Sequence, residues 1–364
     1  MTARVLVAMS GGVDSAVAAA RLVDAAYDVV GVTLHLWDYP DDAAQTKTSR
    51  CCAPEDQYDA KCQADALGIP HYTFDRRDLF AETVVAPFVA AYMAGETPSP
   101  CADCNRGVKL RELFALADRL GASHVATGHY ARVVHHGGHP ALAQGRDLAK
   151  DQSYFLYATP PAQLARLHFP LGDSTKAEVR AEATSRALPG ANKGESQELC
   201  FIGSKPHGYA PFVEQRALAK VRPGAIVDQD GRVVGQHAGI HHFTVGQRKG
   251  LGVASPEPRY VTKVDAATGA VHLGRSDDLL SSGALLDDVT LAPSVELPRT
   301  ARVRVRYRHD GTPGRIIPGD GAATGTLRVM FDEPVRAVTR GQIAVLYDDD
   351  RVLGGGRISV VGTA

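Results

Sequence analysis

Apolar positions in the first 200 residues follow two alternating patterns. Short apolar runs, such as RVLVAM at 4–9 and DVVGVTLHLW at 28–37, have the length and β-branched content of buried strands. Longer segments with apolar residues at helical spacing lie between such runs, for example DSAVAAARLVDAA at 14–26 and GVKLRELFALADRLGA at 107–122. Strands that alternate with helices predict an α/β fold with a doubly wound parallel sheet.

The pattern changes after about residue 205. Helical spacing fades, and short segments with alternating apolar and polar residues take its place, as in GAIVDQDGRVVGQ at 224–236 and RYVTKVDAATGAVHLG at 259–274. Glycine-rich and acidic turns such as DQDG separate these segments, which is typical of β-hairpins. The second part of the chain is therefore predicted to be β-rich, with two small modules that meet near residue 285.

Composition sets limits on the fold and the class of protein. A chain of 364 residues exceeds the roughly 250–300 residues of a single core, so two or three domains are expected. The net charge of −1 means that any nucleic-acid surface must be local. Six cysteines are too few for a disulfide scaffold, and neither a signal peptide nor a membrane-spanning run is apparent. We expect a cytoplasmic protein with reduced thiols.

The string VAMSGGVDSAVAAARL predicts a strand, a tight turn at Gly11 and Gly12, and a helix that begins near Asp14. Glycines let a backbone approach a phosphate closely, and a helix N-terminus offers N–H groups and a positive dipole end. Ser10 and Ser15 add hydroxyl donors, and Asp14 is suited to hold Mg²⁺. The Gly-Lys-Ser/Thr of a Walker A loop is missing. The structural alternative is a simple helix cap.

Three cysteines are candidates for chemistry. Cys101 and Cys104 form a CxxC in SPCADCNRG at the start of a predicted helix, a position that favours thiolates. Cys200 stands alone in ESQELCFIG, where the structural alternative is a small buried hydrophobic residue. A CxxC is also half of a zinc site, but no second pair follows at the spacing of a zinc finger. All three thiols together are compatible with a [4Fe–4S] cluster that has one open iron.

A family resemblance joins these motifs. SGGVDS resembles the phosphate loop of the N-type ATP pyrophosphatases, or PP-loop superfamily. With TPSPCADCNRGVKL, HVATGHYAR, KDQSYFLY, ESQELCFIG and FTVGQRKGLG in this order, the chain is similar from end to end to the tRNA-specific 2-thiouridylases. The resemblance implies a PP-loop catalytic domain at 1–204, a central β-rich domain at 205–285 and a C-terminal β-barrel that contacts tRNA at 286–364.

The resemblance also implies a reaction and its participants. ATP adenylates O2 of the wobble uridine of tRNA, and sulfur then replaces the activated oxygen to give 2-thiouridine, AMP and pyrophosphate. Cys200 would carry the persulfide and Cys104 would act as nucleophile, either by releasing hydrosulfide or by resolving the persulfide as a Cys104–Cys200 disulfide. A cysteine desulfurase or a sulfur-relay protein would supply the sulfur. ATP and Mg²⁺ are the implied cofactors, with Asp14 among the catalytic residues.

Specific contacts follow from the same resemblance. Nucleotide binding is implied for Ala8, Met9, Ser10, Gly11, Gly12, Val13, Asp14, Ser15, Leu34 and Gly128. Contact with tRNA is implied for Ser99, Pro100, Cys101, His129, Lys150, Asp151, Gln152, Arg306, Tyr307 and Gln342. The chain departs from the family where Asn-Pro-Asp is common and Ser-Pro-Cys stands here, so the carboxylate that would act as general acid or base is missing at Cys101.

Arginines at period two in TARVRVRYRHDG indicate a basic surface. On a strand their side chains would share one face, with Val303, Val305 and Tyr307 on the other. Four like charges favour a polyanionic partner, and the alternative is a solvated edge strand. The arginines are Arg302, Arg304, Arg306 and Arg308.

Alternatives to the thiouridylase function remain at this point. One is the same reaction with a [4Fe–4S] cluster held by Cys101, Cys104 and Cys200. Another is a PP-loop synthetase that adenylates a small molecule, which would need neither paired thiols nor an arginine strand. A third is an RNA-binding scaffold with a degenerate nucleotide loop.

Overall fold

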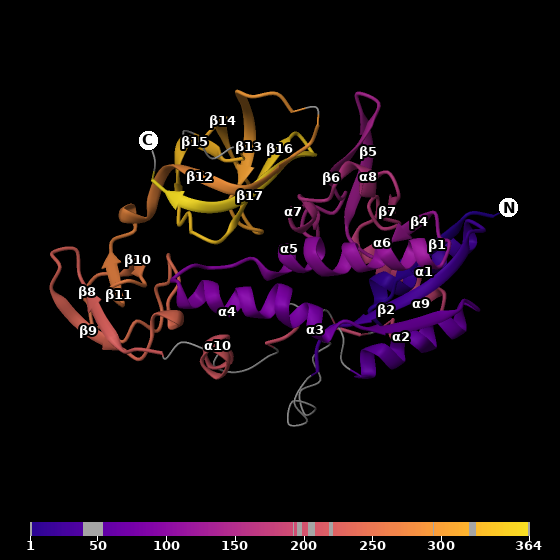
Figure 1. Cartoon of the computed structure of the whole chain (residues 1–364), viewed down its shortest axis with the longest axis horizontal. Helices are drawn as coiled ribbons and strands as arrows, with labels where there is room; N and C mark the ends of the chain where they lie inside the picture. The colour runs from indigo at the N-terminus through magenta and orange to yellow at the C-terminus, as the bar shows by residue number, and fades with distance from the viewer. Residues whose placement is uncertain are drawn as a thin grey trace. The chain divides into compact units, whose positions relative to one another are not determined.

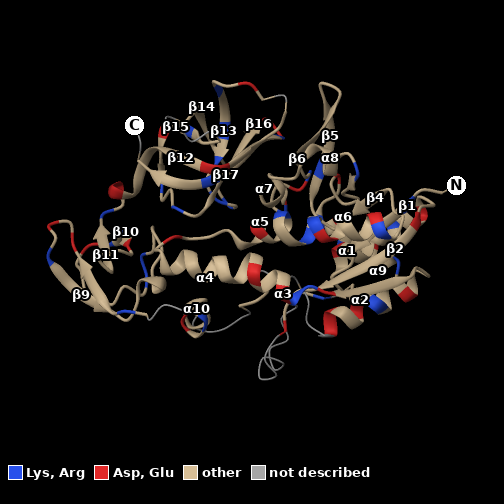
Figure 2. Ribbon diagram, in the orientation of Figure 1, with Lys and Arg blue, Asp and Glu red and all other residues tan. Residues whose placement is uncertain are grey.

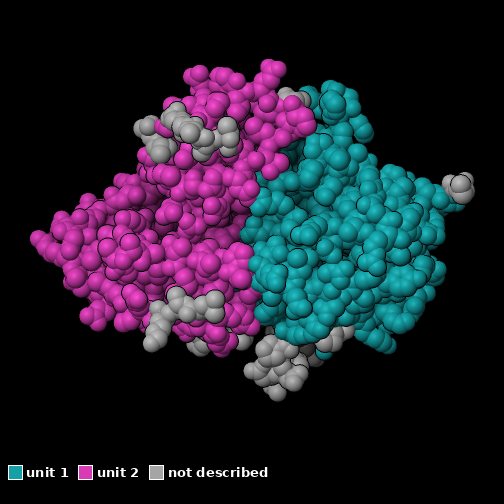
Figure 3. Space-filling model, in the orientation of Figure 1, with its two compact units in different colours: residues 1–84, 100–206, 350–352 teal, residues 85–99, 207–349, 353–364 magenta. Residues whose placement is uncertain are grey.

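The structure is a computed structural model, and it describes residues 2–38, 54–191, 193–194, 199–202, 208–217, 221–293, 295–319 and 325–362. The chain forms two compact units (Figure 3). The first contains residues 1–84, 100–206 and 350–352, and the second contains residues 85–99, 207–349 and 353–364. Lys, Arg, Asp and Glu are interspersed within each unit (Figure 2), as the small net charge leads one to expect.

A parallel sheet organises the first unit (Figure 1). The strand order is β3 (His71–Asp75), β2 (Asp28–His35), β1 (Arg4–Ala8), β4 (His124–Ala126) and β7 (Leu167–His168), and all neighbours pair in parallel. The chain moves outward from β1 to β3 and then returns to β4 on the other side of β1. Because crossovers between parallel strands are right-handed, this reversal puts helices on both faces. The doubly wound α/β prediction is confirmed.

Helix α1 (Val13–Asp24) packs closely on this sheet. Its alanines are almost completely buried and lie between the sheet, α2 (Pro54–Ala66) and α9 (Lys176–Ser185). Val5, Leu6 and Val7 of β1 are completely buried, as expected for a central parallel strand. The other α-helices that the structure describes in this unit are α3 (Arg77–Phe80), α5 (Pro100–Cys104), α6 (Leu110–Arg119), α7 (Ser153–Leu156) and α8 (Pro161–Leu164).

Two further elements complete the first unit. A hairpin of β5 (Ala131–His136) and β6 (His139–Gln144) follows β4. Residues 350–352 return to this hairpin from far along the chain, where Arg351 pairs with Ala143.

The second unit contains a small sheet and a barrel. The sheet has the order β10 (Tyr260–Asp265), β11 (Ala270–Gly274), β8 (Gly224–Val227) and β9 (Val233–His237). Helices α4 (Ala86–Met93) and α10 (Ala210–Arg216) and the 3₁₀ helix η4 (Ile240–His242) pack against one another in the same unit. A further 3₁₀ helix, η5 (Asp277–Leu279), precedes the barrel.

The barrel confirms the prediction for the C-terminal region. Its strands follow the order β12 (Leu280–Leu291), β15 (Leu327–Arg336), β14 (Thr312–Pro318), β13 (Arg299–Arg304), β16 (Ile343–Asp348) and β17 (Arg351–Val361). Pairing of β12 with β17 closes the barrel, which leaves no open sheet edge there. No helix among the described residues is long and apolar enough to cross a membrane.

The prediction that four arginines share one strand face is wrong. Strand β13 ends at Arg304, and the chain turns over the next four residues, so Arg306 and Arg308 lie outside the strand. Arg304 is only 7% exposed, and its guanidinium donates hydrogen bonds to the backbone oxygens of Tyr307 and, at 2.9 Å, His309. Arg304 therefore holds the turn that follows the strand, because its side chain points into that turn.

Candidate active site

The phosphate loop lies at the carboxyl end of β1, beside the point where the strand order reverses. Open α/β sheets bind ligands in this crevice. Gly11 has φ of 73°, and a Cβ there would lie 2.2 Å from the backbone oxygen of Asp56. Gly128, which follows β4, lies so close that a Cβ would be 2.9 Å from the backbone nitrogen of Ser15. Both positions require glycine, so the loop packs backbone against backbone.

The N-terminus of α1 has no side-chain cap. Gly12 is the N-cap residue, and no side-chain hydrogen bond caps the helix. Ser15 instead accepts a hydrogen bond from the Ser10 backbone at 3.1 Å and donates one to the Gly12 oxygen at 2.9 Å. The capping alternative thus fails, and first-turn N–H groups near the dipole's positive end fit a phosphate. The structure therefore fits ATP at this loop.

Asp14 is held by two residues from other parts of the chain. Its carboxylate accepts hydrogen bonds from Lys176 Nζ at 2.7 and 2.8 Å and from the Tyr130 hydroxyl at 2.8 Å. The Lys176 side chain is 12% exposed, so a lysine charge is held beside the phosphate loop. A Mg²⁺ ion on Asp14 would compete with Lys176 for the same oxygens.

Lys176 is a functional candidate that sequence reasoning missed. It is the first residue of α9, where Thr175 and Glu178 form a capping box. The string STKAEV carries the signal of such a helix start. This signal could have predicted a lysine in the first turn of a helix, but only the fold brings the lysine to Asp14.

The predicted tRNA residues 150–152 are connected to Asp14 through Tyr130. The Gln152 side-chain Oε1 accepts a hydrogen bond from the Tyr130 backbone nitrogen at 3.0 Å. The backbone nitrogen of Gln152 donates one to the backbone oxygen of Tyr130 at 2.9 Å. Asp151 is only 1% exposed and accepts hydrogen bonds from Gln144 and from Ser153. Its carboxylate organises this segment, and Lys150 beside it is half-buried. Contact of residues 150–152 with tRNA stays a prediction.

His129 is a neutral side chain at physiological pH. Burial lowers its pKa to about 3, and the positive charge of Lys109 adds to this effect. Its Nδ1 hydrogen-bonds with the Thr127 hydroxyl at 2.8 Å, and its ring meets Phe169 edge to face. A neutral imidazole can hydrogen-bond a base or sugar but forms no ion pair with a phosphate. The predicted contact of His129 with tRNA would therefore be a hydrogen bond to a base or sugar.

Gln63 is a second residue that sequence reasoning missed. It is completely buried on α2, and its Nε2 donates to the backbone oxygens of Gly11 and Pro189, both at 3.0 Å. Lys193 lies four residues after Pro189 and forms ion pairs with Asp56 and Asp59 of α2. The segment that leads toward Cys200 is thereby tied to the phosphate loop. No local pattern marks a buried glutamine for such a role.

The candidate thiols differ in exposure. Cys101 is exposed and Cys104 is 5% exposed, both on α5, which continues into a π-helical stretch η3 (Asn105–Lys109) and then α6. Cys200 is half-buried in a turn, whereas its neighbours Phe201 and Ile202 are buried. The neighbours, rather than Cys200, are the fully buried hydrophobic residues of this motif.

The motif around Cys200 rests on an aromatic cluster. The ring of Phe201 packs edge to face against Trp37 and Phe80, with ring centroids 6.2 Å and 5.7 Å apart. Trp37 follows β2, close in sequence to Leu34, which is buried near the carboxyl end of that strand. Residues 195–198 and Gly203 of the motif, and the two further cysteines Cys51 and Cys52, lie outside the described residues.

Iron–sulfur ligation by the three cysteines gains no support. Cys101, Cys104 and Cys200 all belong to the described residues. In that part of the chain, one group of three metal-binding side chains comes together, and it consists of Glu214, His241 and His242 in the second unit.

The remaining predicted tRNA contacts belong to or border the second unit. Gln342 donates from Nε2 to the backbone oxygens of Thr97 at 2.9 Å and Pro98 at 3.2 Å, so it holds the stretch that leads to Ser99. Ser99 and Pro100 are buried. Arg306 is exposed and donates to the Arg336 oxygen at 3.0 Å, and Tyr307 is half-buried.

Comparisons with known proteins agree over the whole chain. Family models match at residues 3–204 (tRNA methyl transferase HUP domain), 211–275 (tRNA methyl transferase PRC-barrel domain) and 288–358 (Aminomethyltransferase beta-barrel domain). The chain is 64% identical over 359 residues to the tRNA-specific 2-thiouridylase MnmA of Sorangium cellulosum, covering 98% of this chain and 92% of that protein. It is 44% identical to the protein of the same name from Roseiflexus sp., covering 98% and 99%. The chain belongs to the tRNA-specific 2-thiouridylase family.

Proposed function

We propose that this chain is an ATP-dependent tRNA-uridine 2-sulfurtransferase that thiolates C2 of the wobble uridine. One observation carries the proposal: helix α1 has an uncapped N-terminus and follows a turn that requires glycine. The relatives that match the chain over almost its full length are named 2-thiouridylases. A site of this kind binds a phosphate, which is what adenylation by ATP requires.

Adenylation would occur at the phosphate loop. The first-turn N–H groups of α1 would hold the phosphates, and the Lys176 charge beside Asp14 would favour the departing pyrophosphate. Asp14 is the residue that would hold Mg²⁺, which neutralises phosphate charge. Transfer of AMP to O2 of uridine turns a poor leaving group into a good one and releases pyrophosphate.

Sulfur transfer would use the two cysteines in turn. The terminal sulfur of a Cys200 persulfide attacks C2, and the C2–O bond to AMP breaks. The Cys104 thiolate then attacks Cys200 Sγ, so the bond from Cys200 to the transferred sulfur breaks and its electrons stay on the 2-thiouridine. In the second route Cys104 attacks first and releases hydrosulfide, which attacks C2. Both routes end in a Cys104–Cys200 disulfide, which a cellular thiol reductant must reopen.

The tRNA would present its wobble uridine from the anticodon loop. Bases in single-stranded loops can be turned outward into a pocket, whereas paired bases cannot be reached without breaking the pair. Exposed Arg306 and the segment with His129, Lys150 and Gln152 are the proposed contacts. A cysteine desulfurase or a relay protein is the proposed sulfur donor. We propose that the reaction takes place in the cytoplasm.

Three single-cysteine variants test the scheme. We expect Cys200→Ser to release pyrophosphate with unmodified tRNA but to transfer no sulfur. Cys104→Ser should accumulate a persulfide on Cys200, detected by mass spectrometry after loading with a cysteine desulfurase. Cys101→Ser should keep substantial activity, as should the matched control Cys62→Ser on α2. Stoichiometric iron in anaerobic protein, together with an inactive Cys101→Ser, would overturn the persulfide scheme in favour of the cluster.

The same assay separates the two remaining alternatives. An RNA-binding scaffold with a degenerate nucleotide loop would release no pyrophosphate. A synthetase that adenylates a small molecule would release pyrophosphate without tRNA, whereas a thiouridylase needs tRNA with a uridine at the wobble position. The relatives named 2-thiouridylases favour the requirement for tRNA.

A further inference from the structure

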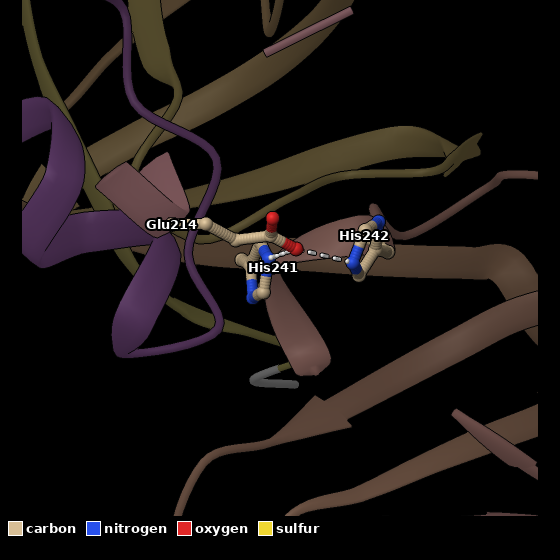
Figure 4. Close-up of side chains that lie close together, drawn as sticks. All are labelled: Glu214, His241 and His242. Carbon is tan, nitrogen blue, oxygen red and sulfur yellow. Dashed lines mark hydrogen bonds and ion pairs between the residues drawn. The ribbon is translucent and has the colours of Figure 1, made fainter. Parts of the chain in front are cut away.

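Three side chains of the second unit, none of which belongs to the proposed active site, come together. Glu214 on α10 and His241 and His242 on η4 come together in Figure 4, and one ligand-type atom from each lies within 4.8 Å of those of the other two. Both imidazoles point Nε2 at the same carboxylate oxygen, with distances of 3.1 Å from His241 and 3.0 Å from His242. The thiolation chemistry uses none of these residues.

These distances resemble those between ligands of one metal ion. Nitrogen and oxygen ligands bind zinc at about 2.0–2.2 Å in a tetrahedron, so two ligand atoms lie about 3.3 Å apart. The two observed separations are only slightly shorter, 3.0 and 3.1 Å. A small outward shift of the carboxylate would therefore admit an ion between the three groups.

The backbone is built around one of the imidazoles. His241 is completely buried, and a Cβ at Gly239 would lie 2.4 Å from its Cε1 and 2.6 Å from its Nδ1. Any side chain at this position would displace the ring. His242 and Glu214 are partly exposed, which leaves a path for an ion and for a water molecule as a further ligand.

We propose that Glu214, His241 and His242 form a binding site for a divalent transition metal ion, with Zn²⁺ as the best match. Two imidazoles and one carboxylate suit zinc better than magnesium or calcium, which prefer oxygen ligands alone. The ligands come from two separate elements, so the ion links α10 to η4 within the second unit. Its role is to stabilise this unit. Each imidazole would bind the ion through the Nε2 lone pair of its neutral form, with the ring proton on Nδ1.

Cobalt and zinc titrations of the full chain test the site. The chain also has thiols, and Co²⁺ distinguishes them because thiolate ligation gives strong near-ultraviolet charge-transfer bands that nitrogen and oxygen ligands lack. After removal of metal by a chelator, we expect the chain to bind one equivalent of Co²⁺ that shows visible d–d bands. This equivalent is counted in addition to any Co²⁺ bound by thiolates. Zn²⁺ should displace this equivalent and raise the Tm.

Glu214→Gln and His242→Asn are the test variants, since both residues are partly exposed and their replacement leaves the fold in place. Each should lower Zn²⁺ affinity at least about tenfold, because losing even a partner of a ligand costs 10–100-fold. The Zn²⁺-dependent rise in Tm should disappear with it. The control is His136→Asn, an exposed histidine at the end of β5, which should bind Zn²⁺ as the unaltered chain does.

Two results would overturn the proposal. One is a Co²⁺ spectrum and stoichiometry that are the same for the unaltered chain and for His242→Asn. The other is a Tm that Zn²⁺ leaves unchanged in all proteins, which would show that the carboxylate is only a hydrogen-bond acceptor for the two histidines. Neither result bears on tRNA thiolation, which is measured separately as 2-thiouridine formed.

Discussion

Asp14 connects the phosphate loop to residues far away in sequence. Lys176 lies 162 positions later and Tyr130 lies 116 positions later, yet both reach its carboxylate. A motif such as SGGVDS can be found in the sequence because its residues are adjacent. Lys176 and the buried Gln63 cannot be found in this way, since their roles arise only when separate segments meet in the fold.

Lys176→Ala should abolish pyrophosphate release while tRNA affinity changes little. The change removes the cation beside the phosphate loop and leaves the Tyr130 hydroxyl as the remaining partner of the Asp14 carboxylate among the described residues. Loss of this partly buried partner should also destabilise the protein by about 1–3 kcal/mol in urea unfolding. The control is Lys61→Ala, whose exposed ion pair with Asp65 contributes little. Normal pyrophosphate release by Lys176→Ala would exclude a role at the phosphate loop.

His129 should make stability depend on pH. Burial lowers its pKa from 6.5 to about 3, so the folded chain resists a proton that the unfolded chain accepts. Stability should therefore fall as the pH drops from about 6.5 toward 3, by up to about 2 kcal/mol at pH 5. Urea unfolding of His129→Asn at pH 7 and pH 5 should lack this contribution. An equal loss in both proteins would show that His129 titrates normally.

At the scale of elements, the spacing of apolar and charged residues predicted the structure only within the bounds of a strand or helix. The alternation of strands and helices predicted the parallel sheet because its central strands, β1 and β2, are continuous and mostly buried runs. The arginine spacing misled because β13 ends at Arg304, and neither the turn nor the direction of the Arg304 side chain shows in a period-two pattern. The glycines of the phosphate loop were found because a tight turn next to a phosphate has a strong local signature.

Arg304 and Arg306 should behave differently when replaced. Arg304→Ala removes buried hydrogen bonds to the turn at 307–309 and should cost about 1–3 kcal/mol in thermal or urea unfolding. Arg306→Ala should leave stability unchanged, weaken tRNA binding and reduce the slope of log affinity against log salt by about 0.7–0.9. Arg232→Ala, an exposed arginine on the β8–β9 turn, is the control. An unchanged salt slope for Arg306→Ala in filter binding would count against contact with phosphate.

At the scale of the molecule, sequence and structure divide the chain differently. Residues 85–99 lie within the predicted catalytic domain, yet they belong to the second unit. On α4, Phe88 and Tyr92 are buried against aromatic rings of the same unit, with Tyr92 stacked on Tyr209 at 4.1 Å. An apolar helix signals that it will be buried, but its sequence does not state against which partner.

A fragment of residues 1–206 should therefore be poorly soluble. It would keep α4 but lose α10 and η4, so Phe88 and Tyr92 would face water and bind a dye such as ANS. Replacing both residues by serine should improve its solubility. The same pair of changes should destabilise the full chain. A monomeric, ANS-negative fragment with the original α4 would refute this prediction.

The short return of residues 350–352 to the first unit also has a consequence in time. The backbone oxygen of Asp350 accepts a hydrogen bond from the Gln144 backbone nitrogen at 2.8 Å, and its carboxylate pairs with Arg132, so the β5–β6 hairpin is completed by residues made long after it. Ribosomes add about 5–20 residues per second, which puts roughly 7–30 seconds between the emergence of residue 206 and that of residue 352. Throughout this interval the nascent first unit has an unfinished edge. Closure of this edge therefore waits until residues 350–352 have been synthesised, and premature termination anywhere before residue 350 leaves both units incomplete.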